Sequence, residues 1–135
     1  MTPEIDADVV FWAGVSPSED RAKVAAAVSH LAGNPAPVEP KGGRTVRLTF
    51  RGTRSLTFQR DQLRDGRIRA AARRLLLRSM DGEEATLLLN RQAAIAKVIA
   101  LCSSPGESPL GPVYLTLRSR KLQELVDWLT EFQPD

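Results

Sequence analysis

Strict alternation of apolar and polar side chains marks residues 44–51, which read Arg44-Thr45-Val46-Arg47-Leu48-Thr49-Phe50-Arg51. Successive side chains of a β-strand point to opposite faces, so this spacing predicts a strand with Val46, Leu48 and Phe50 facing inward. Arginines and threonines occupy the other positions. The stretch therefore predicts a half-buried strand with a basic, solvent-facing side.

Working outward from this strand, the same kind of pattern predicts the remaining elements. Strands are expected at residues 9–13, 85–89, 97–102 and 113–117, and helices at 16–32, 56–64, 67–79 and after Ser119. Ser16 is expected to cap the first helix, with Glu19 completing a capping box, and Ser119 to cap the last. The resulting order, β-α-β-α-α-β-β-β-α, does not alternate regularly. It predicts an α+β fold with a mixed β-sheet and helices packed on one face.

Length and composition favour one domain covering residues 1–135, since 42% of the residues are hydrophobic. The chain has one Cys and one His, which excludes an internal disulfide framework, a cysteine-based zinc site and an HExxH pair. The start of the chain is acidic, and no run of about 18 apolar residues occurs. We therefore expect a cytoplasmic protein that does not cross a membrane.

Charge is distributed very unevenly along the chain. Residues 41–78 contain twelve Lys and Arg against two Asp, a net charge of +10, while the remainder contains seven bases and fourteen acids. Such segregation raises the expectation of an anionic partner, with RNA or DNA first. The alternative is that these arginines are solvated or pair with acids elsewhere in the fold.

Residues suited to catalysis are scarce. His30 is expected near the C-terminus of the first helix, where it interacts favourably with the helix dipole. Cys102 is expected to pack as a small apolar residue in a strand. No phosphate-binding loop and no dinucleotide fingerprint occurs. We therefore predict a protein that is not an enzyme, with no cofactor and no metal ligands.

Two segments carry polar groups that packing alone does not explain. One is Leu88-Leu89-Asn90-Arg91-Gln92-Ala93-Ala94, and the other is Ser108-Pro109-Leu110-Gly111-Pro112-Val113. Asn90, Arg91 and Gln92 have donors suited to phosphates, ribose hydroxyls or base edges, or they tie down the end of a strand. The second segment is suited to stiffening the entry to a strand.

Together with residues 16–20 and 67–73, these motifs resemble a family of small, uncharacterised archaeal proteins described as predicted RNA-binding. The likeness covers about residues 8–132, with Ser18, Arg91 and Val113 standing where the family usually has Thr, Lys and Ile. It implies an α+β fold similar to the ribosomal protein that holds 5S rRNA, and a non-enzymatic role. Some relatives are joined to a P-loop kinase-like domain, so the resemblance also implies a separate nucleotide-kinase-like protein as a partner.

From these observations we predict an RNA-binding module that contacts the phosphates of structured RNA through an arginine-rich surface. Tyr114 is the only aromatic residue expected to point outward from a strand, so base stacking is expected to be minor. The expected contact residues are Arg47, Arg51, Arg54, Arg67, Arg74, Arg78, Asn90, Arg91 and Gln92. The alternative is an interaction domain, either a homodimer in which the basic and acidic regions pair or an accessory of the kinase-like partner.

Overall fold

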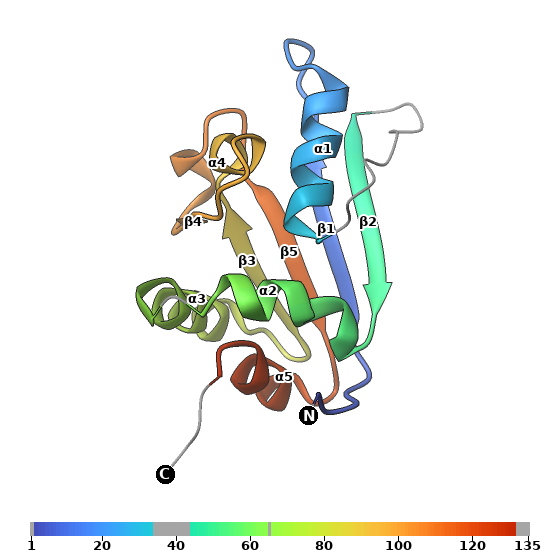
Figure 1. The fold of residues 1–135 in the computed structure, drawn as a ribbon, viewed down its shortest axis with the longest axis vertical. Coiled ribbons are helices and arrows are strands. Elements are labelled where there is room, and N and C mark those ends of the chain that lie inside the picture. Colours follow the sequence, from blue (N-terminus) through green and yellow to red (C-terminus); the bar gives the residue numbers. More distant parts are fainter. Residues whose placement is uncertain (1, 34–43, 65, 132–135) are drawn as a thin grey trace.

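A five-stranded sheet forms the centre of the molecule, with the strand order β2-β1-β5-β3-β4 (Figure 1). The strands are β1 Asp8–Gly14, β2 Thr45–Arg51, β3 Glu84–Leu89, β4 Leu101–Cys102 and β5 Val113–Arg118. The computed structural model describes residues 2–33, 44–64 and 66–131. Every neighbouring pair of strands is antiparallel, so the expectation of a mixed sheet is wrong. Strand direction depends on where a helical connection returns the chain, which alternation within a strand does not reveal.

Helices lie between most of the strands, in the order that the sequence predicts except for one addition. They are α1 Arg21–Leu31, α2 Thr57–Gln62, α3 Gly66–Ser79, α4 Arg91–Ile95 and α5 Leu122–Leu129, with short 3₁₀ turns η1 Thr53–Leu56 and η2 Pro105–Glu107. Figure 1 shows α1 running along β1 in front of the sheet and α2 crossing the strands in front of it. In the described part of the chain, no helix is long and apolar enough to cross a membrane.

Burial with a period of two gives the sheet two different faces. In β1 and β5, Val9, Phe11, Leu115 and Leu117 are buried, and their neighbours in each strand are not. The buried apolar side chains of α1, α3, α4 and α5, together with Leu56 and Leu63 on either side of α2, join the same hydrophobic cluster, so the helices and one face of the sheet share a core. Burying one such Leu or Phe contributes about 1.5–3 kcal/mol.

The other side of the sheet carries side chains that are partly or fully exposed, and we call it the open face. Its residues are Asp8, Val10, Trp12, Arg47, Thr49, Arg51, Glu84, Thr86, Leu88, Tyr114, Thr116 and Arg118. The apolar members of this set lie outside the core cluster. The predicted half-buried strand with a basic outer side is therefore confirmed in β2.

The first helix begins later than its capping signal predicts. α1 begins at Arg21, and its N-cap is Asp20, whose side chain accepts a hydrogen bond from the Ala22 N–H at 2.9 Å. Glu19 does accept the Ser16 N–H at 3.0 Å, as in a capping box, but within a turn that precedes the helix. The expectation that Ser16 caps α1 is therefore wrong, because the Ser16 hydroxyl bonds to Ser18 within this turn and Asp20 supplies the cap.

The segment between β3 and β5 is the main departure from the expected order. Asn90 caps a short additional helix, α4, by accepting the Ala93 N–H at 2.9 Å. Lys97 then adopts a positive φ of 62°, so the chain cannot continue as a strand there. The strand expected at 97–102 is consequently reduced to Leu101–Cys102.

Candidate functional site

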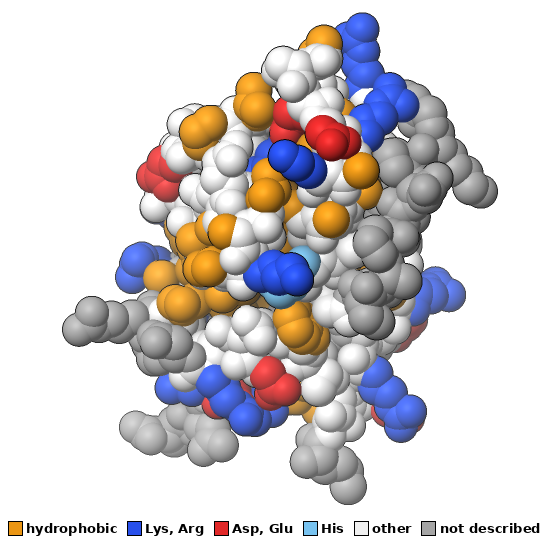
Figure 2. All heavy atoms as spheres, turned by 45° about the horizontal axis from the view of Figure 1, so that its top comes forward, with side chains coloured by type: hydrophobic (Ala, Val, Ile, Leu, Met, Phe, Trp, Pro, Cys, Tyr) orange, Lys and Arg blue, Asp and Glu red, His pale blue; other side chains and the backbone are white. Residues whose placement is uncertain are grey.

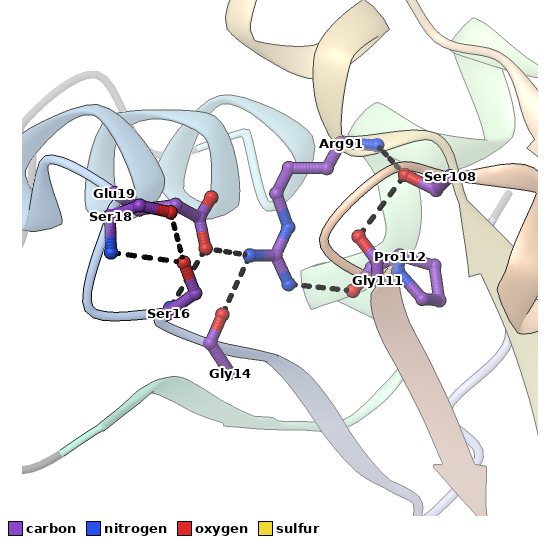
Figure 3. Close-up of polar contacts among 8 residues, drawn as sticks. All are labelled: Gly14, Ser16, Ser18, Glu19, Arg91, Ser108, Gly111 and Pro112. Atoms are coloured by element: carbon purple, nitrogen blue, oxygen red, sulfur yellow. Dashed lines mark hydrogen bonds and ion pairs between the residues drawn. The ribbon is translucent and has the colours of Figure 1, made fainter.

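Arg91 is the most enclosed charged residue of the described structure (Figure 3). Its side chain is 1% exposed, and its Nη1 lies 2.6 Å from a carboxylate oxygen of Glu19, which is 7% exposed. Nη1 also donates to the Gly14 carbonyl at 2.7 Å, and Nη2 donates to the Pro112 carbonyl at 3.2 Å. This buried ion pair joins the end of β1 to the start of β5.

Three of the four motif segments, residues 16–20, 88–94 and 108–113, meet at this ion pair. The Arg91 N–H donates to Ser108 Oγ at 3.1 Å, and Ser108 Oγ donates to the Gly111 carbonyl at 3.1 Å. Figure 3 shows residues of the 16–20, 88–94 and 108–113 segments converging on the guanidinium. These motifs therefore hold parts of the fold together. We call this network the Arg91 clasp, and its residues are Gly14, Glu19, Arg91, Ser108 and Pro112.

This placement corrects the expected role of the 90–92 cluster. Arg91 is buried, and its Nη1 and Nη2 donate within the protein, so it does not lie on a surface that an RNA phosphate reaches. The side-chain oxygen of Asn90 caps α4 by accepting the Ala93 N–H. Gln92 is exposed. Of the three residues, only Gln92 remains free to extend from the surface.

Many of the remaining arginines pair with acids near the C-terminal helix. Glu131 receives Arg64 Nε at 3.0 Å, Arg69 Nη1 at 2.9 Å and Arg60 Nη2 at 3.5 Å. Arg73 pairs with Asp127 at 2.6 Å. The hydrogen bond from Arg64, together with the surrounding guanidinium charges, holds the pKa of Glu131 below its usual range. The basic stretch is therefore partly neutralised within the fold.

The expected contact arginines do not form one surface. Arg47 and Arg51 lie on β2 at one edge of the sheet, whereas Arg78 on α3 donates to the Ser103 carbonyl at 3.4 Å, beside β4 at the other edge. Four strand spacings separate these edges, or roughly 19 Å. Arg54 and Arg74 are exposed elsewhere, and the side chain of Arg67 lies outside the described residues. In Figure 2 the visible basic side chains lie in separate groups, several beside acidic ones.

The open face contains a feature that the sequence reading missed. Trp12 on β1 and Tyr114 on β5 are direct cross-strand partners, and their rings stack with centroids 4.2 Å apart and planes 8° apart. Arg47, exposed on β2, is the partner of Trp12 on the other side. The alternation of Val9 and Phe11 with Trp12 indicates that Trp12 points outward, whereas Tyr114 was the only aromatic residue expected to point outward from a strand.

Cross-strand registers arrange the open face in three rows. The first row is Arg47, Trp12, Tyr114 and Leu88; the second is Thr49, Val10, Thr116 and Thr86; the third is Arg51, Asp8, Arg118 and Glu84. The third row alternates in charge, and Arg51 lies 3.2 Å from Asp8 with both side chains largely exposed. The first row thus combines stacked aromatic rings with an arginine, while the second offers hydroxyl groups.

Cys102 and His30 are the two side chains considered for catalysis, and Cys102 pairs with Leu88 across β3 and β4. Burial, followed by the charge of Glu107, raises the pKa of the Cys102 thiol, which disfavours a thiolate. The His30 ring lies edge-on to Phe58 at 6.1 Å. Among the described residues, no group of three or more His, Cys, Asp or Glu side chains could hold a metal ion.

Relatives of this sequence share most of its length. It is 36% identical to a UPF0201 protein of Sulfurisphaera tokodaii over 124 residues, which is 90% of this chain and 86% of the relative. The chain belongs to the UPF0201 family. A UPF0201 protein of Metallosphaera sedula is 35% identical over 122 residues, covering 90% of this chain and 85% of that protein. No family model matches the chain.

Solved structures support the same fold. A crystal structure of an uncharacterized UPF0201 protein superimposes with a TM-score of 0.73 at 24% identity, covering 95% of this chain and 96% of that one. The UPF0201 protein from Methanococcus jannaschii gives a TM-score of 0.71 at 20% identity, covering 94% and 95%. The single domain built on an antiparallel five-stranded sheet is therefore the UPF0201 fold.

Proposed function

We propose that the open face binds a single-stranded or looped stretch of RNA, without catalysis. The observation that carries this proposal is the stacked Trp12–Tyr114 pair on a solvent-facing sheet, with Arg47 beside it. Sheets that bind single-stranded RNA use exposed aromatic rings to stack two or three bases. The proposed likeness to the ribosomal protein that binds 5S rRNA belongs to the same hypothesis.

Each row of the open face has a separate role in this proposal. The outer faces of the two aromatic rings stack on bases, which every base permits, so sequence preference is weak. Arg47 contacts a phosphate; no described residue forms an ion pair with it. The threonine hydroxyls of the second row bond to base edges or ribose hydroxyls.

The proposed surface replaces the one expected from the sequence. Of the expected α3 arginines, Arg78 lies at the β4 edge of the sheet and Arg74 belongs to the helix, so neither is part of the open face. Arg91 is not part of it because it is buried. The ligand also changes, from structured RNA held by phosphates to an unpaired stretch held by stacking. A non-catalytic role is supported by the raised pKa of Cys102 and the packed ring of His30.

Fluorescence anisotropy of a labelled twelve-nucleotide oligouridine tests the proposal. Trp12→Leu should weaken binding by about 5- to 150-fold, since stacking on one aromatic ring contributes about 1–3 kcal/mol. Arg47→Gln should lower the slope of log K against log salt by about 0.7, the value for one phosphate contact on a single strand. Arg74→Gln, an exposed arginine on α3, is the matched control and should change neither quantity.

Circular dichroism of each variant should first establish that the fold is intact. Failure of the wild type to bind at low salt would refute the proposal. Equal losses in the Arg47→Gln and Arg74→Gln variants would show that binding is diffuse and is not located on the open face.

A further inference from the structure

β2 is an edge strand, with β1 as its one neighbour in the sheet. The Val15 N–H donates to the Arg44 carbonyl at 2.6 Å, and the Gly52 N–H donates to the Ala7 carbonyl at 2.9 Å. These two bonds fix the alternation of the antiparallel ladder, so even-numbered residues of β2 bond to β1. The N–H and C=O groups of the odd-numbered residues therefore point away from the sheet.

No described residue supplies a partner for these outward groups of Thr45, Arg47, Thr49 and Arg51. At the opposite edge of the sheet, formed by β3 and β4, backbone groups have hydrogen-bond partners. There the Asn90 N–H donates to the Ala100 carbonyl at 2.8 Å. Below it, the Thr86 N–H donates to Ser79 Oγ of α3 at 2.9 Å. An exposed row of unpaired backbone groups is a template for another strand, and within the described part of the chain the seven-residue strand β2 provides such a row.

We propose that two copies of this chain associate by antiparallel pairing of their β2 strands about a two-fold axis at Leu48. Pairing must match odd residues with odd residues, because only these carry outward backbone groups. An axis at Leu48 pairs the full strand and sets Arg47 opposite Thr49, and Arg51 opposite Thr45. An axis at Arg47 would set that arginine opposite its own copy, and an axis at Thr49 would set Arg47 opposite Arg51, which is destabilising.

Apolar side chains favour the same arrangement. Leu48 and Phe50 point to the core side of β2, yet they remain half-buried, packed against the edge of the core. The Leu48 axis places the two Leu48 side chains next to each other and Phe50 opposite Val46. Burial of this row on association adds a hydrophobic contribution to the backbone pairing.

The association would create one continuous sheet with both open faces on the same side. Arginines 47 and 51 of both copies would then form a central basic belt, and like charges oppose its formation. Added salt should therefore tighten the dimer. This sign is opposite to that of a dimer held by pairing between the basic and acidic regions, which salt would weaken. The dimer does not depend on the proposed RNA binding.

Sedimentation velocity over a range of protein and salt concentrations gives the first test. The wild type should show a dimer whose dissociation constant falls as salt rises. Thr49→Pro removes an outward N–H and leaves the bonds to β1 intact, so it should be monomeric. Thr49→Val keeps that N–H and is the control. A wild type that stays monomeric at 100 µM, or a dimer that Thr49→Pro leaves unchanged, would overturn the proposal.

Disulfide trapping gives a second test that does not depend on affinity. In a Cys102→Ser background, Leu48→Cys should form a covalent dimer under mild oxidation, because facing residues of a non-hydrogen-bonded pair lie about 4.5 Å apart. Phe50→Cys is the control and should not crosslink, since its partner across the axis is Val46. Equal crosslinking of both variants, or none of Leu48→Cys, would contradict the register.

Discussion

Removing the guanidinium of the Arg91 clasp should destabilise the fold severely. The Glu19 carboxylate is only 7% exposed, and in the Arg91→Met variant the Ser16 N–H is its remaining hydrogen-bond partner. The carbonyls of Gly14 and Pro112 lose the same donor. Truncating one partner of a buried ion pair costs about 3–5 kcal/mol, because the other charge stays buried.

This free energy translates into a large shift of the thermal midpoint. An unfolding entropy of roughly 2.1 cal/mol/K per residue, over 135 residues, amounts to about 0.28 kcal/mol/K. A loss of about 3–5 kcal/mol therefore lowers Tm by roughly 10–18 °C. Urea denaturation followed by circular dichroism measures the free energy directly, and a thermal scan measures the midpoint.

Three further variants isolate the ion pair from other effects. Arg91→Lys keeps the charge but not the forked geometry, so its loss should be intermediate. Arg74→Met removes an exposed arginine and should change stability by less than about 0.5 kcal/mol. When Glu19→Gln is added to Arg91→Met, the loss in the double variant should be smaller than the sum of the two single losses by about 0.5–3 kcal/mol, the coupling expected between contacting groups. A loss below about 1 kcal/mol in Arg91→Met, or strict additivity in the double variant, would refute this reasoning.

Three other predictions follow from single residues. Because the pKa of Glu131 is lowered in the folded protein, the unfolded chain protonates this carboxylate first as pH falls below 4.5, and the free energy of unfolding should decrease there. Glu131→Gln should make this decrease in the free energy of unfolding smaller, as measured by urea denaturation at several pH values. Gly33→Ala should lower the free energy of unfolding by about 1–3 kcal/mol more than Gly82→Ala in the same assay. Both positions have a positive φ, but only at Gly33 would the new Cβ meet the Phe58 ring, at 2.7 Å. Equal losses of stability in the two variants would exclude the clash. The Cys102 thiol should react with a thiol reagent at pH 8 far more slowly in the folded protein than in urea, since burial raises its pKa; equal rates would contradict its burial.

Local sequence patterns were sufficient to predict those elements whose structure depends on residues close together in the chain. The alternation in residues 44–51 and 113–117 predicted β2 and β5, because one packed face imposes a period of two. The same rule, applied to residues 9–13, would have placed Trp12 on the open face. Burial of Val9 and Phe11 bears this out.

Features that depend on distant contacts could not be predicted in this way. Arg91 and Glu19 are 72 residues apart in the sequence, so nothing local distinguishes this arginine from an exposed one. Glu131 lies outside the basic stretch that it neutralises. The antiparallel order of the sheet likewise depends on where each helix returns the chain. The charge map therefore overstated the basic surface that the folded chain presents.

Tryptophan fluorescence provides the most direct test of whether the open face binds RNA. The chain contains two tryptophans, so Trp128→Phe leaves Trp12 as the one reporter, beside Tyr114 and Arg47. Titration with oligouridine at low salt should quench its emission in a saturable way, and added salt should reverse the effect. Emission that stays constant at every RNA concentration would contradict the proposed function.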